Sequence, residues 1–230
     1  MFKIIHKEVL NPFVSMIEVE APLIAKKAEP GQFVILRVHN DGERIPLTVA
    51  DYDREMGTVT MIFQIVGATT KKLNMLNEGD SLCDFVGPLG RPTNLEGLKK
   101  VAVVGGGVGC AIAYPIAKKL HSMGCEVHSI IGFRNKELVI LEDKFTQNSD
   151  LLKIMTDDGS YGEKGLVTNA LEQLIKDGNV YDEVITIGPL PMMKFVCLLT
   201  KQYGIKTTAS MNPIMIDGTG MCGGCRLTVG

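Results

Sequence analysis

Two cysteines near the end of the sequence have the spacing of a metal-binding pair. Cys222 and Cys225 are separated by two glycines and follow the glycine-rich stretch Asp217–Met221. Two thiolates with two small residues between them can point at one metal site. The alternatives are a redox-active dithiol and a zinc knuckle.

The neighbouring residues bear on both alternatives. A thioredoxin-like dithiol follows a strand and opens a helix, whereas here a glycine-rich loop comes first and the β-like stretch Arg226–Val229 comes after. A structural zinc site needs a second pair of ligands, and none lies nearby in the sequence. The pattern therefore favours another kind of thiolate metal site.

A glycine-rich loop in the middle of the chain has the composition of a phosphate-binding turn. The apolar run Val101–Val104 leads directly into Gly105–Gly109, and a helix-like run extends to Leu120. A strand that passes through glycines into a helix offers backbone N–H groups and a helix N-terminus to a phosphate. Glycine matters because a Cβ would hold the phosphate away. The alternative is a tight turn without a ligand.

The match to the dinucleotide fingerprint is incomplete. Cys110 stands at the third glycine position, and Arg134 follows the second strand where an acidic residue would bind the ribose. The preceding strand and the helix nevertheless favour nucleotide binding. The residues predicted to bind it are Gly105, Gly106, Gly107, Val108 and Gly109.

A second candidate anion site lies in the first half. The run Arg44–Thr48 places a cation and a hydroxyl on an expected strand, and Gly67–Thr70 precedes an expected helix. Arg44 could pair with a diphosphate, and the turn could supply backbone donors and the positive end of a helix dipole. The alternatives are a surface charge at Arg44 and a simple helix cap at Thr69 or Thr70.

The two halves of the chain have different secondary-structure patterns. Short β-like runs separated by turns, with one helical stretch at 69–77, fill the first half and predict an antiparallel Greek-key barrel over residues 1–97. From residue 98 to 210, five apolar strand-like runs alternate with helical patterns, which predicts a parallel α/β sheet. Residues 211–230 form a separate C-terminal segment carrying Asp217 and the cysteines.

The composition excludes some classes of protein. With 230 residues, 45% hydrophobic residues and a net charge of −2, the chain has a core but no basic stripe, so we expect no nucleic-acid partner. The longest uncharged run, Val101–Ala117, contains glycines and is shorter than the roughly 20 residues of a membrane-spanning helix. No secretory signal is visible at the start, so we expect a cytoplasmic protein without a membrane partner.

Together these motifs resemble the ferredoxin–NADP reductase superfamily, which pairs a flavin-binding barrel with a nucleotide-binding α/β domain. Within it, the chain is most similar to the electron-transfer subunits of dihydroorotate dehydrogenase and of electron-bifurcating NADH-dependent ferredoxin:NADP oxidoreductase. The resemblance covers essentially the whole chain and includes Gly87–Gly90 at the domain junction.

The resemblance implies three cofactor sites. FAD would be bound by Arg44, Pro46, Leu47, Thr48, Gly67, Thr69 and Thr70. NAD(P) would be bound by the glycine loop, with its nicotinamide and ribose side lined by Arg134, Asp157, Asp158, Gly159, Gly188, Pro189 and Met192. A [2Fe-2S] cluster would use Asp217, Cys222 and Cys225, as in the bifurcating branch, where one carboxylate and three thiolates are expected. The fourth ligand is not in this chain, and a truncated chain is therefore expected.

The resemblance also implies a function. The chain would be an enzyme subunit that moves electrons from NAD(P)H through FAD and the cluster towards a larger catalytic flavoprotein or iron–sulfur subunit, in a heterodimer or higher assembly. Ferredoxin is a further candidate partner, and no protein acid or base is expected to be catalytic. The alternatives are the electron-transfer subunit of dihydroorotate dehydrogenase, in pyrimidine synthesis, and a non-catalytic nucleotide-binding module.

Overall fold

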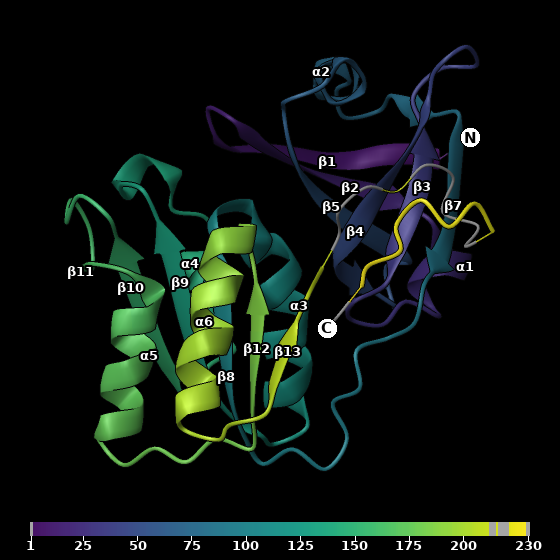
Figure 1. Cartoon of the computed structure of the whole chain (residues 1–230). Coiled ribbons are helices and arrows are strands. Elements are labelled where there is room, and N and C mark those ends of the chain that lie inside the picture. Colours follow the sequence, from purple (N-terminus) through teal and green to yellow (C-terminus); the bar gives the residue numbers. More distant parts are fainter. Residues whose placement is uncertain (1, 212–214, 216–220, 229–230) are drawn as a thin grey trace. The chain divides into compact units, whose positions relative to one another are not determined.

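The computed structural model describes residues 2–211, 215 and 221–228. The chain divides into two compact units. The first consists of Met1–Thr93 together with Asn212–Gly230, and the second of Asn94–Met211. Figure 1 labels the helices and strands of both units.

The first unit is built on one antiparallel sheet of seven strands, in the order β6-β1-β2-β5-β4-β3-β7. Every neighbouring pair is antiparallel, and the sheet is a nearly closed barrel, which confirms the predicted fold. The strands are β1 (Phe2–Asn11), β2 (Val14–Glu20), β3 (Phe33–Arg37), β4 (Arg44–Asp53), β5 (Thr58–Gln64), β6 (Ser81–Leu82) and β7 (Asp84–Leu89).

Alternating side chains fill the interior of this barrel. On β2, Ile17 and Val19 are fully buried, and on β5 Val59, Met61 and Phe63 are at most 2% exposed. These side chains belong to a single hydrophobic cluster. Because successive residues of a strand point to opposite faces, the residues between these buried ones point away from the cluster.

The first unit also contains two helices, α1 (Pro22–Ala25) and α2 (Ala68–Met75). The predicted helix at 69–77 corresponds to α2, which begins one residue earlier and ends two residues sooner. The sequence pattern did not predict α1, because a helix of four residues is too short to show a helical period. Leu73 is the buried residue of α2 and fixes that helix against the barrel core.

The second unit contains a parallel sheet in the order β11-β10-β9-β8-β12-β13. All five predicted strands are present, and the two-residue strand β11 adds a sixth at the edge. So short a strand leaves no period in the sequence. The strands are β8 (Lys100–Gly106), β9 (Glu126–Phe133), β10 (Leu151–Thr156), β11 (Glu163–Lys164), β12 (Glu183–Ile187) and β13 (Thr207–Ala209).

Helices cover both faces of the parallel sheet. The pair α5 and α6 contributes Leu171 and Val196 to a cluster with Ala102 and Val104 of β8, and Figure 1 shows these two helices side by side over one face. Among the residues that the structure describes, no helix is both long and apolar enough to cross a membrane. The helical segments are η1 (Gly107–Gly109), α3 (Cys110–Ser122), η2 (Lys136–Leu138), α4 (Glu142–Gln147), α5 (Val167–Lys176) and α6 (Leu190–Gln202).

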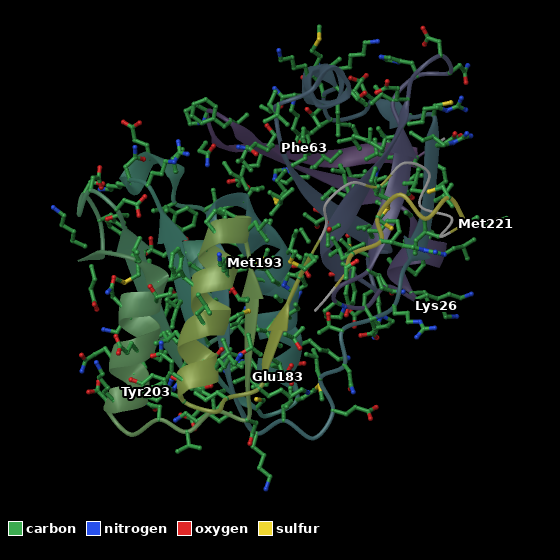
Figure 2. All side chains as sticks on the ribbon, in the orientation of Figure 1. Lys26, Phe63, Glu183, Met193, Tyr203 and Met221 are labelled. Atoms are coloured by element: carbon green, nitrogen blue, oxygen red, sulfur yellow. The ribbon has the colours of Figure 1, made fainter. Side chains whose placement is uncertain are left out.

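The chain reverses its direction of strand addition at β8. From β8 the sheet grows on one side through β9 and on the other through β12. In open parallel sheets, ligands bind beyond the carboxyl ends of the strands at such a switch point. Figure 2 labels Met193, in the first turn of α6, towards that edge of the sheet, and Glu183 at the opposite edge.

Candidate functional site

The predicted flavin-binding strand β4 has two distinct faces. Ile45 and Leu47 pack against the barrel core, so Arg44, Pro46 and Thr48 lie on the outer face. The side chain of Leu47 is therefore directed to the core, and any contact that it makes with a ligand on the outer face uses its backbone. The other three side chains form one row along the outer face of the strand.

Arg44 belongs to a charged row across three strands. Arg37 of β3 is directly opposite Arg44 of β4 and directly opposite Asp84 of β7. One oxygen of Asp84, Oδ2, forms an ion pair with Arg37, 2.8 Å from its Nε, and accepts a hydrogen bond from Arg44 Nη2 at 2.9 Å. The Arg37 guanidinium, and after it that of Arg44, holds the pKa of the Asp84 carboxyl below its usual value.

The N-terminal end of α2 forms the second part of the predicted flavin site. The Thr70 hydroxyl accepts from the backbone N–H of Gly67 at 3.0 Å and donates to the Gly67 carbonyl at 3.1 Å, so Thr70 caps the helix. The first i to i−4 bond runs from Lys71 N to the Gly67 carbonyl. The N–H groups of the first turn before Lys71 therefore precede the helical hydrogen-bond ladder.

The structure brings the two predicted flavin motifs together. The Thr69 hydroxyl donates to Glu43 Oε2 at 3.1 Å, and Glu43 is the chain neighbour of Arg44. The Arg44 end of β4 and the N-terminal end of α2 are therefore adjacent. A guanidinium beside the positive end of a helix dipole has the chemistry of a diphosphate site.

The nucleotide-binding residues predicted in the second unit also lie together. Gly106 is paired with Gly132, Phe133 with Thr156, and Gly105 with Ile187, which places the ends of four strands at one edge of the sheet. The segments that follow these ends hold the predicted site residues, with Gly107–Gly109 in η1 and Met192 in the first turn of α6. They are Gly107, Val108, Gly109, Arg134, Asp157, Asp158, Gly159, Gly188, Pro189 and Met192.

Packing against the loop after β12 accounts for two glycines of this loop, Gly106 and Gly109. A Cβ on Gly109 would lie 2.6 Å from the Ile187 carbonyl oxygen and 2.7 Å from the Gly188 Cα. A Cβ on Gly106 would overlap the Met192 side chain. The loop after β8 therefore packs tightly on the loop after β12, and these two glycines are explained without a ligand.

Gly107 differs from its neighbours. Its φ is +55°, and a Cβ built on it would meet no atom within 4 Å. Packing therefore does not account for glycine there, whereas an open, left-handed backbone at the start of η1 and α3 suits the approach of a phosphate. The thiol of Cys110, at the incomplete third position of the fingerprint, is buried, and burial raises its pKa.

The loop after β10 is held by its own hydrogen bonds. Asp158 accepts from Ser160 N at 2.9 Å, and the bonds from Ser160 lower the pKa of its carboxyl. The Ser160 hydroxyl in turn accepts from Lys136 N at 2.8 Å, which joins this loop to the one after β9. Arg134, the cation predicted at the ribose side, is exposed between them. The two loops therefore present both acids and a cation beside the glycine loop.

Comparisons with known proteins identify the family. No family model matches the chain. It is 47% identical over 211 residues to the dihydroorotate dehydrogenase B (NAD(+)) electron transfer subunit homolog of Thermotoga maritima, covering 92% of this chain and 74% of that one. With the dihydroorotate dehydrogenase B electron transfer subunit of Fusobacterium nucleatum it shares 34% identity, over 85% and 76% of the two chains. The chain belongs to this electron transfer subunit family.

A solved structure agrees with the family assignment. The chain matches a chain of NADH-dependent reduced ferredoxin-NADP oxidoreductase, a protein described for flavin-based electron bifurcation, with a TM-score of 0.92 and 44% identity. The match covers 100% of this chain and 82% of the other. The resemblance expected from the motifs is confirmed, and so is the expected fold class.

The C-terminal cysteines of this family member lie in a tight exposed turn. Gly223 has a φ of +68°, and the Gly224 N–H donates to Cys222 Sγ at 3.5 Å. An N–H bond to sulfur suits a thiolate that binds a metal.

Arg226–Thr228 are not a strand, contrary to the β-like pattern, and Asp217 lies outside the described residues. No cluster of three metal-ligating side chains occurs among the residues with described positions.

Two acidic residues of the barrel region, Asp84 and Glu43, were not predicted from the sequence. Asp84 is 40 positions from Arg44, and Glu43 is 26 positions from Thr69. An adjacent arginine was the only local signal at Glu43, and Asp84 had none, since its role depends on the pairing of β3 with β4 and β7. Strand register, rather than a motif, brings them into the candidate site of this electron transfer subunit.

Proposed function

We propose that this chain is the electron-transfer flavoprotein subunit of a bifurcating, NADH-dependent ferredoxin:NADP oxidoreductase. The observation that carries the proposal is the 44% identity over the whole chain to a chain of such an oxidoreductase, with a TM-score of 0.92. The two anion-binding regions, one in each unit, support it independently, because each has the chemistry of a diphosphate site.

The first unit would bind FAD. Arg44 and the first turn of α2 would hold the diphosphate, while Pro46 and Thr48 would line the outer face of β4. When bound, FAD would supply the chemistry by accepting a hydride from a reduced nicotinamide and releasing its electrons one at a time. The residues of the chain bind and orient the ring, and none of them needs to transfer a proton in this scheme.

The second unit would bind NADH or NADPH at the carboxyl edge of its sheet. The open backbone at Gly107 would accept the diphosphate, and Gly106 and Gly109 would keep the two supporting loops close enough to form the cradle. Arg134, Asp157 and Asp158 would surround the ribose side. Gly188, Pro189 and Met192 would line the nicotinamide side of the site.

The C-terminal segment would bind a [2Fe-2S] cluster, with Asp217, Cys222 and Cys225 as three of its ligands. The hydrogen bond from Gly224 to Cys222 supports thiolate ligation. Electrons would leave towards a larger flavoprotein or iron–sulfur subunit in the cytoplasm, with ferredoxin as a further partner.

The test is purification of the native subunit with its partner, followed by flavin and iron analysis. We expect one FAD and two iron atoms per copy of this subunit, and bleaching of the flavin absorbance on addition of NADH. A colourless protein that takes up no FAD would contradict the proposal and would favour the non-catalytic nucleotide-binding module.

A second candidate function is electron transfer for dihydroorotate oxidation. The 34% identity to the Fusobacterium nucleatum subunit and the name of the Thermotoga maritima homologue favour it. The co-purified complex separates the two candidates, because a dihydroorotate dehydrogenase would reduce NAD⁺ with dihydroorotate. Reduction of NAD⁺ by dihydroorotate would overturn our first choice. No reaction with dihydroorotate, together with NADH-dependent reduction of NADP⁺ by reduced ferredoxin, would support our first choice.

A further inference from the structure

We infer that Asp84 is a positioning residue of the proposed flavin site, which holds the Arg44 guanidinium in place for the FAD diphosphate. The inference rests on the proposed binding of FAD to the first unit. It assigns a role to a residue that is not among the predicted flavin-binding residues and that acts through Arg44.

The geometry is that of a two-step anchor. Asp84 is held first by an ion pair with Arg37, whose Nε lies 2.8 Å from Oδ2, and the same oxygen accepts a hydrogen bond from Arg44 at 2.9 Å. Arg37 itself is fixed by a bond from Nη1 to the Asn40 carbonyl at 2.7 Å. The backbone therefore holds Arg37, Arg37 holds Asp84, and Asp84 holds Arg44.

Exposure explains why Arg44 needs an anchor. Its side chain is 60% exposed, whereas those of Asp84 and Arg37 are 24% and 22% exposed. A long exposed side chain samples many rotamers, and fixing it on ligand binding costs conformational entropy. A carboxylate that already restricts Arg44 reduces this cost, because the guanidinium is held before the diphosphate arrives.

The anchor also leaves Arg44 able to bind an anion. Asp84 uses Nη2 of Arg44, and a guanidinium has five N–H donors in a rigid fork. Donors on the other nitrogens therefore remain for phosphate oxygens. The outer face of β4, which carries Arg44 with Pro46 and Thr48, directs the guanidinium away from the core.

The experiment is a double-mutant cycle on the purified full-length subunit, with FAD affinity measured by fluorescence quenching after removal of the flavin. Asp84→Asn keeps the shape but removes the charge, and we expect it to weaken FAD binding about two- to five-fold. Arg44→Gln should weaken binding more. In the Arg44→Gln background, Asp84→Asn should have no further effect, because no guanidinium remains to be positioned.

A matched control comes from the same unit. Glu29 pairs with Arg54 at 2.6 Å with similar exposure, and Glu29→Gln should leave the FAD affinity unchanged. Thermal unfolding identifies variants that fail to fold. Should Asp84→Asn not fold, the same cycle is run with Asp84→Glu, which keeps a charge near Arg37 but displaces its oxygens by one methylene.

The outcomes separate the inference from the function on which it rests. Wild-type protein that takes up no FAD would overturn the proposed function, and the inference with it. If wild type binds FAD and Asp84→Asn binds it equally well, only the inference fails. It also fails if Asp84→Asn weakens binding by the same factor with and without Arg44, since that result would mean a general structural role.

Discussion

The Thr69 hydroxyl donates a hydrogen bond to the Glu43 carboxylate at 3.1 Å, so an acid from the β3–β4 connection lies at the first turn of α2. A negative charge is favourable at the N-terminal end of a helix. This is the position that we propose for a flavin phosphate, so Glu43 and the diphosphate would compete for the same dipole and the same hydroxyl.

Replacing Glu43 should therefore strengthen FAD binding. We expect Glu43→Gln to lower the dissociation constant of FAD about two- to five-fold at low salt, from the usual size of a charge–dipole interaction. The gain should shrink as ionic strength rises, because exposed charges are screened. Titration of the flavin-free subunit at two salt concentrations measures both effects. Weaker binding by the variant would show that Glu43 supports the site.

Two glycines of the nucleotide loop should respond differently to substitution. Asparagine tolerates the left-handed backbone of Gly107, so Gly107→Asn should keep the thermal stability close to that of wild type but weaken NADH binding. Gly109→Ala should lower the free energy of unfolding by about 1–3 kcal/mol, because the new Cβ would collide with the backbone of the neighbouring loop. Calorimetry and NADH titration of both variants test this. Full NADH affinity in Gly107→Asn would remove Gly107 from the site.

The buried His128 should make stability sensitive to acid. Its ring lies between the Tyr181 hydroxyl and the Glu126 carboxylate, near Lys100 and Asp150, and burial, followed by Lys100, lowers its pKa below 6.5. The unfolded chain therefore binds this proton more readily than the folded protein does.

The stabilising contribution of neutral His128 should be present above pH 6.5 and decrease as the pH falls towards the lowered pKa. We expect the melting temperature of wild type to fall more steeply between pH 7.5 and 5.5 than that of His128→Gln. His121→Gln, which alters a partly exposed histidine of α3, is the control and should keep the wild-type slope. Equal slopes in wild type and His128→Gln would contradict the prediction.

Replacing either of the two C-terminal cysteines should lower the iron content and leave the flavin content unchanged. Cys222→Ser and Cys225→Ser, made in the native complex, should each lose the cluster absorbance and most of the iron while keeping FAD, because a [2Fe-2S] core needs four ligands. Cys197→Ser, at a half-buried cysteine of α6, should keep both. Iron content and the visible spectrum give the readout, and unchanged iron in both cysteine variants would exclude the predicted cluster ligands.

Local patterns predicted the elements that are long enough to show a period. The apolar run before Gly105 continues as β8, and the helical stretch at 69–77 corresponds to α2. Local patterns failed for α1 and β11, which have four and two residues. The candidate site divides in the same way: the glycine loop and Arg44 were found from local sequence, whereas Asp84 and Glu43 were not.

The sequence by itself determined that an antiparallel and a parallel unit follow one another, where the candidate phosphate-binding loop lies, and which cysteines could bind a metal. Alternation, glycine placement and spacing act over a few residues, so they can be read along the chain. Only the tertiary structure decided that Arg44 contacts Asp84, that Thr69 contacts Glu43, and that Gly109 is fixed by packing while Gly107 is open. These relationships depend on strand register and on the packing of distant loops, which no short stretch of sequence specifies.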